Sequence, residues 1–223
     1  MRLSQSFSTA VLLGLLVMGL GNKCFADSVM YSNLGTGSGV YNGDQGWNVI
    51  GAANPSVNPL SQYAPAFSFT PASTAYFTQL DMAMAHVNGT NSATVDLMTD
   101  ESGPGTVLES WSVSGLQING TCCTLLALSG NGTILIESGM TYWVAALPGD
   151  SLAFDSWEYD STGVTGTVFE NEGTGWALYS NGVTDGAFEV QGEASTIPEP
   201  GTLGLFGSGL LGLIGLLRRR SRQ

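Results

Sequence analysis

Hydrophobic and polar side chains alternate along the middle of the chain with the two-residue period of β-strands. Residues 76–85, for example, place Tyr76, Leu80 and Met82 together on one face of a single extended strand. This period indicates strands that bury one face, and the body of the chain lacks the 3.6-residue period of a helix. We expect strands at residues 47–50, 76–85, 93–99, 107–113, 124–128, 133–136, 140–147, 152–159, 165–169, 176–179 and 187–191.

Turn signals separate these segments at short intervals. The dipeptide Asn-Gly recurs at residues 42–43, 88–89, 119–120, 131–132 and 181–182. Each is a turn candidate because both residues tolerate positive φ. Many short strands with close turns predict an all-β fold, either a sandwich or a barrel. Uneven strands and long loops favour a jelly-roll-like β-sandwich.

The first 26 residues have the pattern of a secretory signal peptide. Arg2 precedes an apolar run over residues 10–20, and the small residues Cys24 and Ala26 follow, with cleavage expected after Ala26. Cys24 raises the alternative of a lipoprotein, but Lys23 stands where a small residue is expected. The pattern therefore predicts an exported chain that enters through the Sec translocon. We divide it into a signal peptide (1–26), an acidic ectodomain (27–195) and a tail (196–223).

The tail joins three features that together predict a membrane anchor. Pro198-Glu199-Pro200 excludes helix, because proline fixes φ and lacks an N–H donor. Residues 203–217 follow and contain no charged side chain, so we expect them to form a short transmembrane helix. A basic stop then marks the cytoplasmic side. Its members are Arg218, Arg219, Arg220 and Arg222.

This order of motifs resembles the PEP-CTERM sorting signals of exported proteins from Gram-negative bacteria that make exopolysaccharide. The resemblance covers residues 196–222, and the alternative is an ordinary C-terminal membrane anchor. It implies recognition by an exosortase, a membrane-embedded enzyme thought to cut near Pro198-Glu199-Pro200. The implied route crosses the inner membrane, holds the body in the periplasm, and ends at the cell surface or in the extracellular matrix.

The body carries a second resemblance, to the choice-of-anchor group of bacterial surface domains, R type. The group has no established activity, so the resemblance implies an extracellular β-sandwich and a location, but no chemistry. The matching segments are residues 95–97, 103–105, 108–111, 139–144 and 187–190.

Charge is distributed very unevenly. Residues 27–196 contain no lysine or arginine but hold 17 of the 18 acidic residues. Binding to nucleic acid is excluded, because phosphate neutralisation needs cations. The acidity either keeps a secreted protein soluble or recruits divalent cations. For the second case, Asp96, Asp100 and Glu101 are our candidate calcium ligands, with oxygen donors near one loop.

Catalytic constellations are sparse. His86 is the only histidine, and Cys122 and Cys123 are adjacent, so neither a zinc site nor a redox Cys-x-x-Cys motif can be assembled. The two cysteines have three possible states: a vicinal disulfide, free thiols, or bonds between molecules. Acidic pairs suited to a glycoside hydrolase are expected by chance among 17 acids. We therefore expect no enzyme.

Carbohydrate binding is the alternative to a purely structural role. Trp157, Tyr159 and Trp176 lie in an aromatic, acidic, glycine-rich region that suits stacking on sugar faces, unless they fill the core. The sequence thus predicts an exosortase-sorted surface or matrix protein with a structural or interaction role in exopolysaccharide or biofilm. Its alternatives are a calcium-assisted carbohydrate-binding module and, distantly, a glycoside hydrolase.

Overall fold

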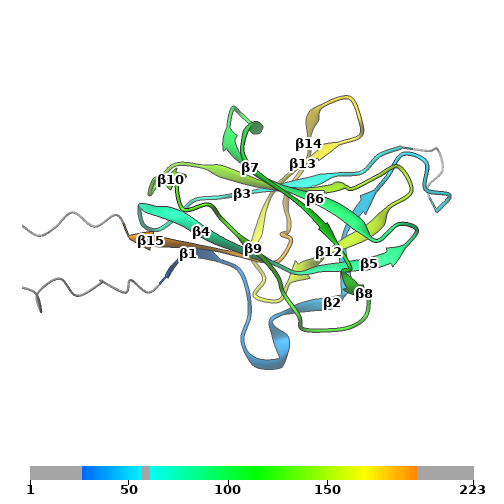
Figure 1. Cartoon of the computed structure of the whole chain (residues 1–223), viewed down its shortest axis with the longest axis horizontal. Coiled ribbons are helices and arrows are strands. Elements are labelled where there is room, and N and C mark those ends of the chain that lie inside the picture. The colour runs from blue at the N-terminus through cyan, green and yellow to red at the C-terminus, as the bar shows by residue number, and fades with distance from the viewer. Residues whose placement is uncertain (1–26, 57–60, 195–223) are drawn as a thin grey trace, which may run out of the picture.

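The computed structural model describes residues 27–56 and 61–194, and these form an all-β body with one short 3-10 turn, η1 (Gly37–Gly39) (Figure 1). The all-β prediction is confirmed. The strands are β1 (Ser28–Ser32), β2 (Tyr41–Ile50), β3 (Pro65–Phe69), β4 (Ala75–Met82), β5 (Met84–Asn88), β6 (Ser92–Asp100), β7 (Pro104–Ser114), β8 (Gln117–Ile118), β9 (Leu126–Ser129), β10 (Leu135–Ile136), β11 (Tyr142–Pro148), β12 (Phe154–Asp160), β13 (Thr165–Asn171), β14 (Trp176–Thr184) and β15 (Phe188–Ala194).

Within the described ranges, no helix has the length and apolar character needed to span a membrane. The expected signal peptide (1–26) and the expected transmembrane helix of the tail both lie outside these ranges.

One layer of the body is a six-strand sheet in the order β14-β13-β3-β11-β6-β7, with every pair antiparallel. β11 lies inside it, and Val144, Ala145 and Ala146 are buried on both of its faces. Small and β-branched residues suit such a strand because both sides are covered.

The other layer is built from two sheets that meet at Ala83. A five-strand sheet contains β1, β15, β4, β9 and β10, and a four-strand sheet has the order β2-β12-β5-β8. Ala83 separates β4 from β5. Its N–H donates to the carbonyl oxygen of Ala187, the residue before β15, at 3.1 Å, and its carbonyl accepts from Glu158 N of β12 at 2.8 Å. Ala187 N donates to Glu158 O at 2.8 Å, which completes the junction. This arrangement agrees with the predicted β-sandwich.

The core lies between the layers and takes large side chains from all three sheets. Trp157 from β12 packs edge-on against Phe67 from β3, with ring centroids 5.2 Å apart, and against Phe188 from β15 at 5.7 Å. All three are fully buried. Each such side chain contributes roughly 1.5–3 kcal/mol of hydrophobic stabilisation.

The expected facing of residues 76–85 is wrong at its start, although Leu80 and Met82 are buried as expected. Phe77 is fully buried, whereas Tyr76 is 40% exposed. The cause is a bulge: Gln79 pairs with Gln191 but Phe77 pairs with Gly192, so Thr78 is an extra residue on β4. An extra residue reverses the alternation on one side of it.

Candidate functional site

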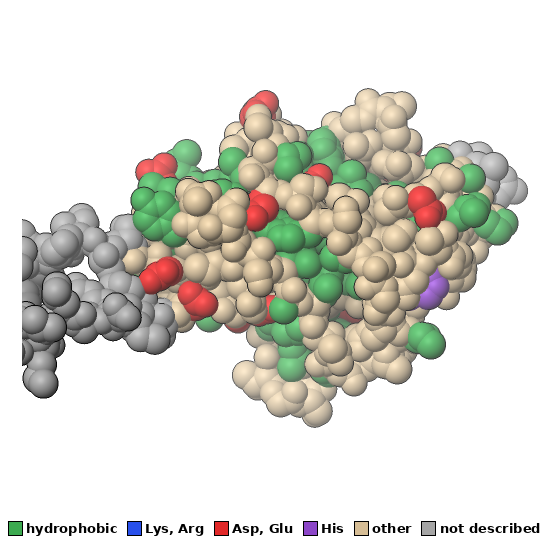
Figure 2. All heavy atoms as spheres, viewed as in Figure 1, with side chains coloured by type: hydrophobic (Ala, Val, Ile, Leu, Met, Phe, Trp, Pro, Cys, Tyr) green, Lys and Arg blue, Asp and Glu red, His purple; other side chains and the backbone are tan. Residues whose placement is uncertain are grey.

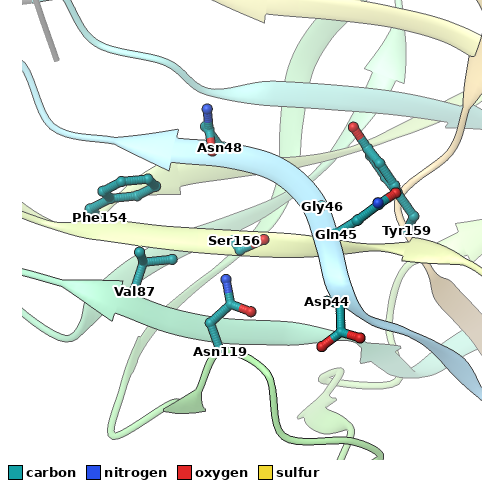
Figure 3. Close-up of a pocket in the computed structure, with 9 residues that line it drawn as sticks. All are labelled: Asp44, Gln45, Gly46, Asn48, Val87, Asn119, Phe154, Ser156 and Tyr159. Carbon is teal, nitrogen blue, oxygen red and sulfur yellow. The ribbon is translucent and has the colours of Figure 1, made fainter. Parts of the chain in front are cut away.

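A cleft of about 330 Å³ lies on the four-strand sheet, on the side of β12 that carries Ser156. Its lining combines amide, hydroxyl and carboxylate groups with two aromatic rings, contributed by β2, β12, β5 and the residue that follows β8. Figure 3 shows these side chains around the opening. They are Asp44, Gln45, Gly46, Asn48, Val87, Asn119, Phe154, Ser156 and Tyr159.

One wall of the cleft is an excursion in β2. Glu158 pairs with Gly46 but the next residue, Tyr159, pairs with Asn42, so residues 43–45 have no partner on β12. Asn42 Oδ1 accepts a hydrogen bond from the Asp44 N–H at 3.2 Å, which closes a tight local turn. The excursion leaves the side chains of Asp44 and Gln45 exposed at the rim of the cleft. The predicted Asn-Gly turn at 42–43 is therefore part of a bulged strand.

Gly46 lets β2 lie close to β12 at the base of this wall. A Cβ at this position would lie 2.3 Å from Ser156 Oγ and 2.5 Å from the Trp157 carbonyl oxygen. Only glycine fits without moving β12, because the carbonyl belongs to the backbone of the neighbouring strand. The Ser156 hydroxyl thereby reaches the cleft lining.

The opposite wall follows β8. The Asn119 N–H donates to His86 O at 2.9 Å, and the Gly120 N–H donates to Gly43 O at 3.1 Å. These bonds tie the loop to β5 and to the excursion of β2. Further along the loop, Cys122 and Cys123 are joined in a disulfide. A Cβ at Gly43 would lie 3.1 Å from Cys122 Cβ, so the disulfide segment packs against the same excursion.

Two rings give the cleft its apolar surface. Tyr159 is half-buried and its ring meets Trp47 edge-on, with centroids 5.9 Å apart. Burial raises the pKa of Tyr159, and the neighbouring Tyr179 adds to the rise, so its hydroxyl stays neutral at physiological pH. Phe154 is half-buried at the other end of the lining. Rings beside amides and hydroxyls form a lining suited to a polyhydroxylated ligand.

Of the three aromatic residues predicted for sugar binding, only Tyr159 lines this cleft. The prediction of Trp157 as a binding residue is wrong, because Trp157 is 0% exposed and its Nε1–H donates to Ala187 O at 3.1 Å inside the core. Trp176 is half-buried on β14 and packs against a buried cluster of the six-strand sheet formed by Ala66, Met98, Trp143 and Ala145. The three therefore do not form one surface. Sequence reasoning missed Asp44, Asn48 and Asn119, because strand pairing alone brings them together.

The predicted calcium ligands are also separated. Asp96 and Asp100 stand four residues apart on β6, which is roughly 13 Å along an extended strand. Asp100 Oδ1 accepts from Trp143 Nε1 at 2.7 Å, and Glu101 Oε1 accepts from Thr106 Oγ1 at 2.9 Å. Over residues 27–56 and 61–194, no three His, Cys, Asp or Glu side chains gather as a metal site.

Buried acids are an unexpected feature of β12. Glu158 is 0% exposed at the junction of the two smaller sheets, and over residues 27–56 and 61–194 neither of its carboxyl oxygens has a hydrogen-bond partner of normal geometry. Burial raises the pKa of Glu158 to about 7; the nearby Ser156 hydroxyl opposes the rise and Asp44 adds to it. On the face of the described body seen in Figure 2, acidic side chains reach the surface and no lysine or arginine accompanies them.

Residues 196–220 match the PEP-CTERM protein-sorting motif. The match covers the predicted Pro-Glu-Pro, the apolar segment and the first three arginines, Arg218, Arg219 and Arg220. It supports an exported chain that is membrane-associated first, is sorted by an exosortase, and is then located at the surface. A comparison with curated proteins found no match to the chain.

Proposed function

We propose that this protein is an extracellular interaction module of an exopolysaccharide or biofilm matrix, and that its acidic body binds polysaccharide in the cleft of the four-strand sheet. The observation that carries the proposal is the lining of that cleft, where Tyr159 and Phe154 lie beside Asp44, Asn48 and Asn119. The body acts by binding, without catalysis. Export through the Sec translocon and exosortase processing near Pro198-Glu199-Pro200 deliver it to the cell surface or matrix, in line with a choice-of-anchor domain of R type.

Charge narrows the class of ligand. The body has no lysine or arginine, and Asp44 is exposed at the rim of the cleft. An anionic polymer would approach against the charge of the whole body, whereas a neutral polymer would not. The expected ligand is therefore a neutral polysaccharide, whose hydroxyls can bond to the amides and whose sugar faces can stack on the rings.

A binding assay with soluble neutral and acidic polysaccharides tests the proposal on the full-length protein. Asn48→Trp places a large ring in the cleft from an exposed position of β2 and should abolish binding. Ser112→Trp makes the same change at an exposed position of β7, in the other layer, and should bind as the parent does. Asn119→Ala removes an amide at the opposite wall and should weaken binding about fivefold to tenfold.

Two outcomes would overturn the proposal. One is equal binding by Asn48→Trp and the parent protein. The other is the absence of binding to every polysaccharide on a broad glycan array, which would leave a purely structural role.

A further inference from the structure

A second group of acids lies at the strand ends beside Asn33. Asp160 ends β12, and Asp185 lies between β14 and β15. The Asp160 N–H donates to the Asp185 carbonyl at 2.9 Å, so the two residues are held together through their backbones. Their side chains are also buried, because Asp160 is 5% exposed and Asp185 is 2% exposed.

Hydrogen bonds satisfy only some of the carboxyl oxygens of Asp160 and Asp185. Asp160 Oδ1 accepts from the N–H groups of Thr162, Gly163 and Val164 at 2.8, 2.7 and 3.0 Å, and from Thr162 Oγ1 at 2.9 Å. Asp160 Oδ2 and Asp185 Oδ1 are buried and have no hydrogen-bond partner among the residues that the structure describes. These two buried carboxyl oxygens are therefore left unsatisfied, which costs free energy in a low-dielectric site.

The surroundings leave room for the Asp185 carboxyl group. A Cβ at Gly166 would lie 2.5 Å from Asp185 Oδ1 and 3.0 Å from Oδ2. The Asp185 carboxyl group thus occupies the space that a side chain at position 166 on β13 would need, and glycine leaves that space free. Residues 161–163 above Asp160 are exposed, and Thr162 Oγ1 donates to the Asn33 carbonyl at 3.4 Å. The pair therefore lies directly beneath a surface loop.

No positive side chain of the body can neutralise the pair. Residues 27–196 contain no lysine or arginine, and His86 is bonded to Asp155 instead. The missing counter-charge must come from outside the chain or from a proton.

We propose that Asp160 and Asp185 bind a calcium ion, with Asp160 Oδ2 and Asp185 Oδ1 as its carboxylate ligands. Calcium accepts six to eight oxygen ligands, including carbonyl oxygens and water, so backbone carbonyls and water would have to complete the coordination that the two carboxylates begin. Magnesium demands a stricter octahedron and keeps its own water. The site shares no residue with the lining of the polysaccharide cleft and differs from the Asp96, Asp100 and Glu101 position predicted from the sequence.

Thermal unfolding of the full-length protein tests this proposal. After EDTA treatment and dialysis, calcium at about 100 times its Kd should raise Tm by about 5–10 °C. The expected Kd is about 0.1–1 mM, the range of extracellular calcium modules. Magnesium at the same concentration should raise Tm much less. Asp185→Asn, which keeps the shape but removes one charge, should abolish the calcium effect, whereas the control Asp100→Asn should retain it.

Isothermal titration with calcium chloride keeps the test valid if Asp185→Asn fails to fold. The parent protein should bind one calcium ion, and Gly166→Ala, which presses a methyl group against Asp185 Oδ1, should bind at least about tenfold more weakly. If the pair shares a proton instead, calcium will leave Tm unchanged and no heat will be measured. Either that result or an undiminished calcium effect in Asp185→Asn overturns the proposal.

Discussion

His86 Nδ1 lies 2.9 Å from Asp155 Oδ1, and this pair joins the only histidine of the chain to a carboxyl group that is fully buried. The two residues face each other across the β5–β12 ladder, where they are paired in register. The other carboxyl oxygen, Asp155 Oδ2, has no hydrogen-bond partner within the described part of the chain. His86 therefore supplies the hydrogen bond on which burial of this acid depends.

Replacing His86 should destabilise the protein through Asp155. His86→Ala leaves the buried carboxyl without its partner and should lower the free energy of unfolding by about 2 kcal/mol. This corresponds to a fall in Tm of about 4–8 °C. The double variant with Asp155→Ala should lose less than the sum of the two single variants, because both remove the same interaction. Additive losses in the thermal melts would contradict the coupling.

Stability should fall as pH rises, opposite to the usual behaviour of acidic groups. Burial raises the pKa of Asp155 to about 6, against the opposing influence of His86, and burial raises those of Glu158 and Asp185 to about 7. The folded state then holds protons that the unfolded state has lost at the same pH. The free energy of unfolding should therefore decrease from about pH 4 to about pH 7.

Melting curves between pH 5 and pH 8 in EDTA will show this fall as a decreasing Tm. Glu158→Gln removes one of the three groups, so its Tm should change less steeply with pH. A Tm that rises through this window in the parent protein would refute the prediction.

Adding one methyl group at Gly46 should disrupt the cleft. Gly46→Ala forces a Cβ against Ser156 Oγ and the Trp157 carbonyl, and should cost about 1–3 kcal/mol as β2 moves away from β12. Gly39→Ala is the matched control, because a Cβ there meets nothing within 4 Å and its φ is not positive. Chemical denaturation should separate the two variants, and equal midpoints would show that the close approach is unimportant.

Truncation of Trp157 should unfold much of the body. Trp157→Ala removes the largest fully buried side chain and its bond to Ala187 O, at a cost of about 3–5 kcal/mol. Trp176→Ala should cost less, because that ring is only half-buried on β14. If far-UV circular dichroism and melting curves find both variants equally stable, the core position of Trp157 is disproved.

Alternation located most of the strands, because a buried face repeats every second residue whatever the partner strand is. It failed at Thr78, where the bulge on β4 exchanges the faces of Tyr76 and Phe77. The extra residue is defined by the partner β15 and leaves no mark in the local pattern. The β2 excursion at residues 43–45, which builds one wall of the cleft, was hidden for the same reason.

The burial of individual side chains was the other property that the sequence pattern could not predict. Trp157 and Tyr159 look alike in the sequence, as aromatic residues two apart beside acids. In the structure the first fills the core and the second lines the cleft. Likewise, Asp160 and Asp185 are distant in the chain and meet only because β12 ends beside the link between β14 and β15. Contacts of this kind depend on sheet order, which the sequence pattern does not encode.

The pairing of β1 with β15 determines how a tethered molecule would bear mechanical load. Ser28 pairs with Gly192, so the chain enters and leaves the body at one end, while β5 and β8 of the four-strand sheet lie toward the other (Figure 1). A pull on the tail reaches the body through Ala194 and passes into β15, which is bonded to β1 on one edge and to β4 on the other. Force applied along such a strand shears two ladders at once instead of opening one bond at a time. We therefore expect the body to resist a pull along β15 more strongly than a pull that opens one ladder from its end.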